Sequence, residues 1–308
     1  MNVLLVVLGV ALLYLGGEVL VRSASGLASR LGVRPMVIGL TVVAFGTSAP
    51  ELAASLTAAI SGTPEIAVAN VVGSNIANVG LILGLTALLY PLVTSSRFVR
   101  REVPLMLLVT AALAPVLWGG RVSRWEGVVL LALLGGFLWL ISRGGSTLLD
   151  EVESAEQLAR TPAWLGLLGT VAGLVLLWGG AQALVGGAVA LATAVGVSQR
   201  VIGLTVVAIG TSLPELASSM VAALRREADL ILGNIVGSNV FNLLAVLGAT
   251  SVVRPIRFDG RAVTPDIVVM AAFSLALLPL MWRGQRLGRA GGAVLLIGYL
   301  AYVLALVR

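Results

Sequence analysis

Long apolar segments recur along the whole chain, and short polar stretches separate them. Each segment has about 20 residues, enough for a helix to cross roughly 30 Å of hydrocarbon. Ten membrane-spanning helices are predicted, at residues 2–22, 35–60, 64–89, 103–119, 124–142, 162–182, 200–224, 228–252, 264–282 and 288–307. Small residues follow spans one and six, so these two helices can continue to about Gly32 and Gly196. The pattern predicts an all-α polytopic membrane protein.

The composition agrees with a chain that lies in lipid. Hydrophobic residues make up 58% of the sequence, charged residues make up 11%, and the mean hydropathy is +1.05. The first span lacks an early charged region and a cleavage site, so we predict a retained helix rather than a signal peptide. The chain has no cysteine and no histidine. This excludes disulfides, thiolate ligands and imidazole ligands, so any bound metal ion must be held by oxygen.

The basic residues predict the orientation in the membrane. The net charge is +6, but the arginines are scattered between apolar spans, so a nucleic-acid surface is not indicated. One set of alternating breaks holds twelve arginines: Arg30, Arg34, Arg97, Arg100, Arg101, Arg143, Arg160, Arg225, Arg226, Arg283, Arg286 and Arg289. The other set holds seven: Arg121, Arg124, Arg200, Arg254, Arg257, Arg261 and Arg308. Positive charge favours the cytoplasmic side, which places both termini outside a multi-pass cell-membrane protein.

The sequence contains an internal duplication. Residues 37–53 read VIGLTVVAFGTSAPELA and residues 201–217 read VIGLTVVAIGTSLPELA, with fifteen of seventeen positions identical at an offset of 164. The same offset carries Asn70, Gly73, Ser74, Asn75, Asn78 and Pro91 onto Asn234, Gly237, Ser238, Asn239, Asn242 and Pro255. Such a gap-free register through polar residues inside apolar spans indicates duplication rather than similar composition.

The spacing of the copies predicts that the two halves are inverted. Five spans separate each element from its copy, and an odd number reverses the direction in which the chain crosses the membrane. We therefore predict two inverted five-helix repeats, at residues 1–142 and 162–308, joined by a cytoplasmic linker at 143–161. Inverted repeats with helices interrupted by glycine and proline at matching positions are typical of secondary transporters.

Three acidic residues lie well inside predicted apolar segments. Glu51 and Glu215 occupy equivalent positions, each directly after a proline that leaves the carbonyl of Gly46 or Gly210 without its usual helical partner. Buried charges in a membrane are expensive, which favours a functional role for this pair. Glu18 has no acidic counterpart and lies four residues before Arg22, so we interpret it as half of an ion pair.

The repeated motifs predict a site for a hard cation. Each Gly-Thr-Ser-X-Pro-Glu segment offers hydroxyls, freed backbone carbonyls and one carboxylate. Ser74 and Asn78, and likewise Ser238 and Asn242, are spaced to lie on one helical face. For Asn75 and Asn239 a close-packing role is as plausible as a functional one. Two carboxylates with neutral oxygens suit calcium or sodium better than magnesium, which dehydrates reluctantly.

At these residues the chain resembles the sodium/calcium exchanger family, within the cation/calcium antiporter superfamily. The motifs GTSAPE (46–51) with GSNIAN (73–78), and GTSLPE (210–215) with GSNVFN (237–242), are similar to the two repeats of that family. The resemblance covers nearly the whole chain and is closest to the compact prokaryotic type. It implies two tilted helices, here spans one and six, that slide against a core of eight.

The resemblance also implies ligands for the ions. Calcium would be held by Glu51 and Glu215 with the carbonyls of Thr47 and Thr211. Sodium would use that cluster and flanking positions. The flanking set comprises Ser48, Ser212, Ser74, Ser238 and the carbonyls of Ala44 and Ala208. Asn78 matches the asparagine of the first repeat, whereas Asn242 departs from the aspartate that well-known sodium/calcium exchangers carry.

The leading functional prediction is a secondary antiporter that exchanges calcium for sodium by alternating access. Coupling of calcium to protons is the nearest alternative, because the glutamates can exchange protons for cations. A channel would need a continuous polar pore with several weak sites, and the sequence supplies one compact pair of motifs. An enzyme is not indicated, since the serines lie beside no evident base. No cofactor or obligate protein partner is evident; the predicted partners are the ions and the lipid bilayer.

Overall fold

The computed structural model describes residues 2–143, 163–194, 210–282 and 284–307. In the first half, the elements are α1 (Asn2–Leu31), α2 (Pro35–Ile38), η1 (Gly39–Val43), α3 (Ala44–Thr47), α4 (Ala49–Ile60), α5 (Pro64–Ala77), η2 (Asn78–Leu83), α6 (Gly84–Leu89), β1 (Leu92–Val93), η3 (Phe98–Glu102), α7 (Val103–Trp118), β2 (Arg121–Val122) and α8 (Arg124–Arg143). In the second half, they are α10 (Ala163–Ala194), α13 (Leu213–Leu224), α14 (Ala228–Phe241), η5 (Asn242–Val246), α15 (Leu247–Val253), β3 (Ile256–Arg257), α16 (Gly260–Trp282), β4 (Arg286–Leu287) and α17 (Arg289–Val307). The η segments are short π-helical stretches within longer helices.

The helices confirm the predicted all-α membrane architecture. Within the described residues, nine helices are long and apolar enough to cross a membrane, and α13 is the described part of the predicted seventh span. The first span runs to Leu31 and the sixth is described to Ala194, as the small-residue stretches predict. Spans four and nine begin earlier than predicted, at Phe98 and Gly260. Their first turns carry charged residues, so an apolar pattern does not detect them. Nearly all of the predicted linker lies outside the described residues.

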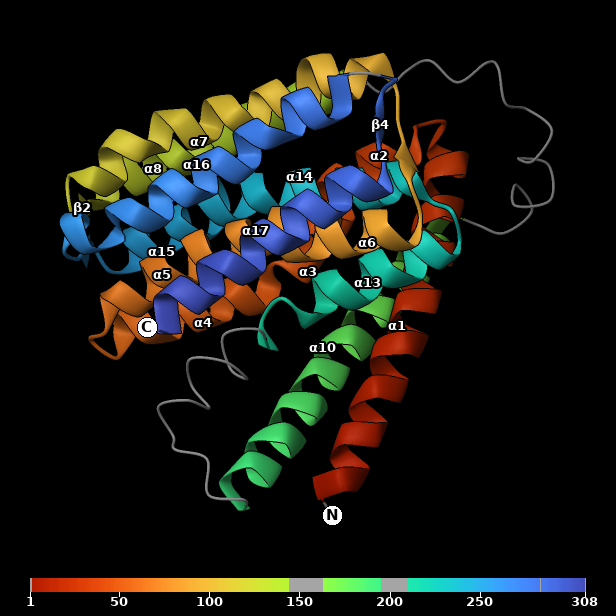
Figure 1. Cartoon of the computed structure of the whole chain (residues 1–308), viewed down its shortest axis with the longest axis horizontal. Helices are drawn as coiled ribbons and strands as arrows, with labels where there is room; N and C mark the ends of the chain where they lie inside the picture. The colour runs from red at the N-terminus through yellow and green to blue at the C-terminus, as the bar shows by residue number, and fades with distance from the viewer. Residues whose placement is uncertain (1, 144–162, 195–209, 283, 308) are drawn as a thin grey trace.

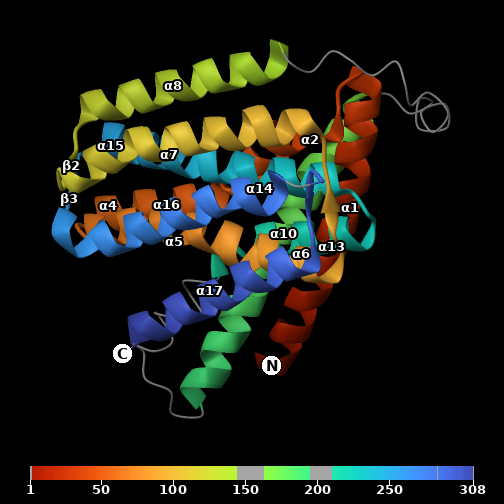
Figure 2. The ribbon, with the colours of Figure 1, turned by 45° about the horizontal axis from the view of Figure 1, so that its top comes forward.

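Two short antiparallel strand pairs show that the halves are inverted. β1 pairs with β4, with Leu92 opposite Leu287, and β2 pairs with β3, with Val122 opposite Ile256. β1 and β3 occupy equivalent places in the two repeats, yet their pairs lie at opposite ends of the molecule (Figures 1 and 2). The breaks therefore fall into the two groups that the arginine analysis distinguishes. Which group faces the cytoplasm remains a prediction.

The two long helices α1 and α10 form a closely packed pair. They lie side by side and cross the direction of the other helices (Figure 1). Glycines bring the two backbones together: a Cβ added at Gly9 would lie 2.5 Å from the nitrogen of Leu184, and one at Gly173 would lie 2.6 Å from that of Leu20. Such small-residue contacts replace side-chain interdigitation in membrane helices. α1 and α10 therefore constitute one structural unit.

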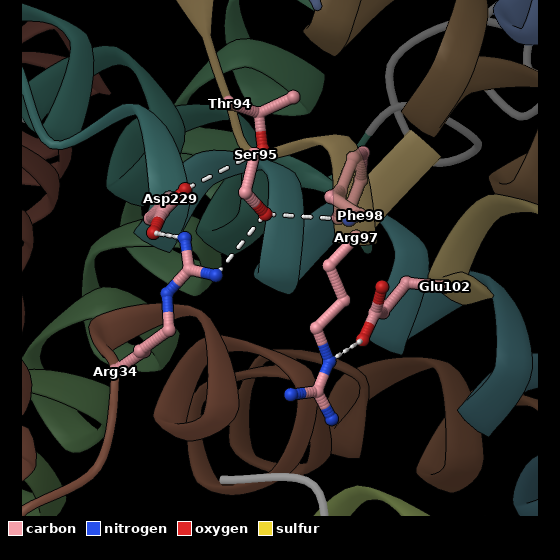
Figure 3. Close-up of polar contacts among 7 residues, drawn as sticks. All are labelled: Arg34, Thr94, Ser95, Arg97, Phe98, Glu102 and Asp229. Atoms are coloured by element: carbon pink, nitrogen blue, oxygen red, sulfur yellow. Dashed lines mark hydrogen bonds and ion pairs between the residues drawn. The ribbon is translucent and has the colours of Figure 1, made fainter. Parts of the chain in front are cut away.

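A polar cluster ties both halves together at the end of the molecule that contains β1 and β4. Arg34, directly before α2, pairs with Asp229 of α14 at 2.7 Å and donates to the hydroxyl of Ser95 at 3.0 Å. Nearby, Arg97 lies 3.7 Å from Glu102, which is buried (Figure 3). Since Arg34 belongs to the first repeat and Asp229 to the second, the cluster fixes the entry of the second span against the core.

Candidate functional site: a buried oxygen cluster at two interrupted helices

The helix is irregular at both predicted interruptions: at Ser48 in the first repeat, and at Thr211 and Ser212 in the described part of the second. α3 ends at Thr47 and α4 begins at Ala49, while Ser48 between them has φ −80° and ψ 2°. At the equivalent place, Ser212 has φ −90° and ψ 8° directly before α13. Pro50 and Pro214 stand near the start of the following helices, where the missing N–H leaves no helical bond unmade. Glu51 and Glu215 therefore lie in the first turns of α4 and α13, directly after the irregular residues.

The two glutamates are completely buried, and one is held by the opposite half. Glu51 and Glu215 both have 0% exposed surface. The hydroxyl of Ser212 donates to Glu51 Oε1 at 3.1 Å and also lies 3.3 Å from the hydroxyl of Ser74. These contacts join Ser212, at the interruption of the second repeat, to candidate ligands of the first. The interruptions therefore meet at one place rather than forming two separate sites.

The threonines of the motifs are anchored across the two halves by asparagines. Thr47 donates to Asn234 Oδ1 at 3.2 Å, and Thr211 donates to Asn70 Oδ1 at 3.4 Å. Asn70 in turn donates to the backbone oxygen of Glu51 at 3.0 Å. Sequence reasoning assigned these two asparagines no role. Their signal was available: each is a duplicated polar residue one turn before Ser74 or Ser238 in an apolar span.

Asn78 and Asn242 lie at equivalent irregularities in the third and eighth spans. Each is the first residue of a π-helical segment, η2 or η5, which interrupts the regular helix. Such single-turn π segments occur frequently at functional sites. Both side chains are buried, with 1% and 0% of their surface exposed. The nitrogen of each amide is hydrogen-bonded, whereas the oxygen of each has no partner.

Buried oxygen atoms without hydrogen-bond partners are concentrated in the predicted ligand set. In the described part of the chain ten such side-chain oxygens occur, and six belong to predicted ligands: Ser48 Oγ, Glu51 Oε2, Asn78 Oδ1, both carboxylate oxygens of Glu215, and Asn242 Oδ1. An unpaired buried polar group costs on the order of 1–3 kcal/mol, and an unpaired charge costs more. A cation coordinated by these oxygens removes that cost, so the donor set fits a hard cation.

The remaining predicted residues differ in their availability. Ser238 is buried, and its hydroxyl lies 3.5 Å from that of Thr47. The carbonyl of Ala44 accepts the backbone N–H of Ser48 at 3.0 Å and the hydroxyl of Thr47 at 3.5 Å, so it is already engaged. Ala208 lies outside the described residues. The structure thus brings the side chains of the two motif pairs together, apart from this one undescribed carbonyl position.

Glu18 lies outside this cluster. It pairs with Arg22 at 3.4 Å, which confirms the predicted ion pair, and it also pairs with Arg225 at the end of α13. The second partner was not predicted, because the sequence does not reveal which helix end meets α1. Glu18 therefore links α1 to the end of α13 in the second repeat.

Known proteins resemble this chain along its whole length. Residues 1–143 and 165–308 match the family profile described as "Sodium/calcium exchanger protein". The chain is 43% identical over 306 residues to "Putative antiporter CaxA" of Alkalimonas amylolytica, covering 96% of each chain. It is 31% identical over 347 residues to "Sodium/calcium exchanger MaX1" of Methanosarcina acetivorans, covering 99% of this chain and 98% of that protein.

Solved structures give the same result for the fold. A structure of the sodium-calcium exchanger NCX_Mj soaked with 10 mM Na+ and zero Ca2+ matches with a TM-score of 0.88 and 32% sequence identity. The match covers 99% of this chain and 98% of that chain. The overall fold and the inverted arrangement of the two halves are therefore those of a known membrane exchanger.

Proposed function

Because this chain belongs to the sodium/calcium exchanger family, we propose that it moves calcium out of the cell in exchange for sodium. It is a multi-pass membrane protein of a family of cation/calcium antiporters, and coupling to sodium is the part that we propose. The observation that carries the proposal is the group of six unpartnered buried oxygens supplied by both inverted halves. Two carboxylates with neutral oxygens match the preference of calcium and sodium for hard ligands.

In this proposal Glu51 and Glu215 supply the negative charge and the other oxygens complete the coordination shell. Calcium is held by the two carboxylates with the carbonyls of Thr47 and Thr211. Sodium uses the same carboxylates and flanking oxygens: Ser48, Ser74, Asn78, Ser212, Ser238, Asn242 and the carbonyls of Ala44 and Ala208. Because Ala44 O already accepts two hydrogen bonds, we expect it to be a weaker ligand than a carbonyl that accepts none.

Sharing of the carboxylates explains exchange. Glu51, Glu215, Asn78 and Asn242 carry a formal charge of minus two when both glutamates are ionised, and one calcium ion or two sodium ions balance that charge. Both ions cannot occupy the carboxylates together without excess positive charge in a buried site. A site with two bare buried carboxylates is also costly. Only a loaded site then crosses between the two faces, which couples the two fluxes.

The helix pair α1–α10 is the proposed moving part. Its two helices are joined backbone to backbone through glycines, and it crosses the direction of the core helices (Figure 1). A sliding movement of this pair relative to the core would open the buried site to one face at a time. The core would keep the oxygen cluster intact during the movement.

Coupling of calcium to protons is the second candidate. The observation that favours it is Asn242, which leaves the site with two carboxylates and a formal charge of minus two, the charge that one calcium ion balances. Protons bound to Glu51 and Glu215 would balance that charge as well as two sodium ions would. The proton candidate requires calcium transport that continues when sodium is absent.

Flux measurements with separated gradients test the proposal. The purified protein is reconstituted in proteoliposomes, and calcium-45 uptake is driven by an outward gradient of sodium, potassium or protons alone. We expect uptake with the sodium gradient and only background uptake with the other two. Equal uptake with a proton gradient and no sodium would contradict sodium coupling and support the proton alternative.

A further inference from the structure

Asn75 and Asn239 are buried beside the oxygen cluster but are directed at the amides of the opposite half. Asn242 Nδ2 donates to Asn75 Oδ1 at 3.1 Å, and Asn78 Nδ2 donates to Asn239 Oδ1 at 3.0 Å. Asn75 and Asn239 have 2% and 1% of their surface exposed. Each of these asparagines therefore accepts a hydrogen bond from a candidate ligand of the other repeat. Neither accepts one from the candidate ligand three residues later in its own helix.

Further contacts fix the orientation of these two asparagines themselves. Asn75 Nδ2 donates to the backbone oxygen of Asn239 at 3.2 Å and lies 3.7 Å from the sulfur of Met270. Asn239 Nδ2 lies 3.5 Å from the sulfur of Met106. Met106 and Met270 are also related by the offset of 164. With Nδ2 used in this way, Oδ1 of each asparagine is left to accept from the opposite amide.

The direction of an amide decides whether it attracts or repels a cation. An asparagine side chain has an oxygen that accepts and an NH₂ group that donates. At Asn78 and Asn242 the NH₂ end is bound across the halves, and the oxygen of each has no hydrogen-bond partner. A flipped amide would place two oxygens face to face at Asn75 or Asn239 and would turn a donor toward the ion.

We propose that Asn75 and Asn239 are positioning residues, which orient the amides of Asn242 and Asn78 so that their oxygens face the transported cation. Neither residue contacts the ion. The inference rests on the proposed exchange function and adds to it a reciprocal arrangement, in which each repeat sets the ligand of the other. Asparagine is needed at both positions because it combines an acceptor for the opposite amide with a donor that locks its own orientation.

A double-mutant cycle tests this role, with calcium affinity measured by calcium-45 binding to purified protein and calcium-for-sodium exchange measured in proteoliposomes. Asn75→Ala removes the acceptor, and we expect about tenfold weaker calcium binding, the loss of one net buried hydrogen bond. In the Asn242→Ala background the same change should weaken binding by less than about twofold, because no amide remains to be oriented. In the Asn78→Ala background, the tenfold loss should persist.

Matched variants separate positioning from packing. Asn75→Leu has a similar shape and no acceptor, and it replaces Asn75→Ala in the cycle if the alanine variant folds poorly. It should show the same loss of calcium affinity, about tenfold. Thr86→Val alters an equally buried hydroxyl that bonds within its own helix, and it should leave affinity unchanged. Unfolding temperature in detergent is measured for every variant.

Each outcome of the cycle bears on the proposal. A tenfold loss of affinity that persists in Asn242→Ala, or no loss in Asn75→Ala and Asn75→Leu, would overturn the positioning role while leaving the exchange function intact. A wild-type protein that neither binds calcium nor exchanges it for sodium would overturn the proposed function and the positioning role with it. Non-additive losses of calcium affinity for the pairs Asn75 with Asn242 and Asn239 with Asn78, and for no other pairing of these residues, would support the proposed function and the positioning role.

Discussion

Replacing either buried glutamate with glutamine tests the charge of the site. Glu51→Gln and Glu215→Gln keep the shape of the side chain and remove one of two fully buried carboxylates. The formal charge of the four central side chains then rises from minus two to minus one. A calcium ion held there would keep one uncompensated positive charge in a buried environment.

The size of the effect follows from the charge of the ion. Two unit charges 4 Å apart attract each other by about 4 kcal/mol at an effective dielectric constant of about 20. Loss of one carboxylate therefore removes about 8 kcal/mol of gross attraction for calcium and about 4 kcal/mol for sodium. Rehydration and relaxation offset much of this. We expect calcium affinity to fall at least about 100-fold, which corresponds to about 2.7 kcal/mol, and sodium affinity to fall less.

The assay is calcium-45 uptake into sodium-loaded proteoliposomes, together with calcium binding to the purified protein. Glu65→Gln is a matched control, because Glu65 is an exposed acid in the first turn of α5 and should tolerate the change. Calcium flux close to that of the wild type in either Glu51→Gln or Glu215→Gln would refute the assignment. An equal loss of calcium and sodium affinity would refute the charge argument even if flux disappeared.

Three further predictions concern topology, stability and coupling. Ser61 lies beside Gly62, which is the repeat equivalent of Arg226. Ser61→Cys should react with impermeant thiol reagents from the outside, and Arg226→Cys should react from the cytoplasmic side. Labelling of both from one side would contradict the inverted topology. Asp229→Asn should lower the unfolding temperature in detergent, and a double-mutant cycle with Arg34→Met should give a coupling of about 1 kcal/mol; additive effects would show that the ion pair contributes nothing. In the wild type, reversal potentials should give nearer two sodium ions per calcium, or coupling that includes protons, and Asn242→Asp should increase the pH dependence of transport. A ratio of three sodium ions per calcium that is unchanged by Asn242→Asp would show that this charge count does not control coupling.

Much of this architecture follows from one regularity in the sequence. The offset of 164 residues relates Ser48 to Ser212 and Asn78 to Asn242, and the structure places an interruption or a π segment at both members of each pair. A duplicated polar pattern inside apolar spans is therefore enough to predict the inverted fold and the candidate ligands. Proline alone does not determine these features, because Pro115, Pro265 and Pro279 lie inside continuous helices; the signal is the duplicated combination of glycine, hydroxyl residues and proline beside a buried carboxylate.

The partners of these residues could not be predicted, since they depend on how the halves pack. Thr47 meets Asn234, and Asn78 meets Asn239, across more than 150 residues of chain. Periodicity shows which face of a helix is polar but not which polar groups face each other. Glu102 was missed for a different reason: it lies in the charged first turn of the fourth span, outside the apolar run, yet it is buried.

The symmetry of the site contrasts with the ends of the molecule. With asparagine at both 78 and 242, the four central candidate ligands are of the same residue types in the two repeats. Two ion pairs at one end have no counterpart by sequence. Arg34 pairs with Asp229 and Glu18 pairs with Arg225, whereas the repeat-equivalent pairs of positions hold Ser198 with Glu65 and Gln182 with Ser61. Neither equivalent pair of residues can form an ion pair, so these two ion pairs stabilise the packing at one end and are not repeated at the equivalent positions. We therefore expect that opening this end would require these two ion pairs to break or rearrange.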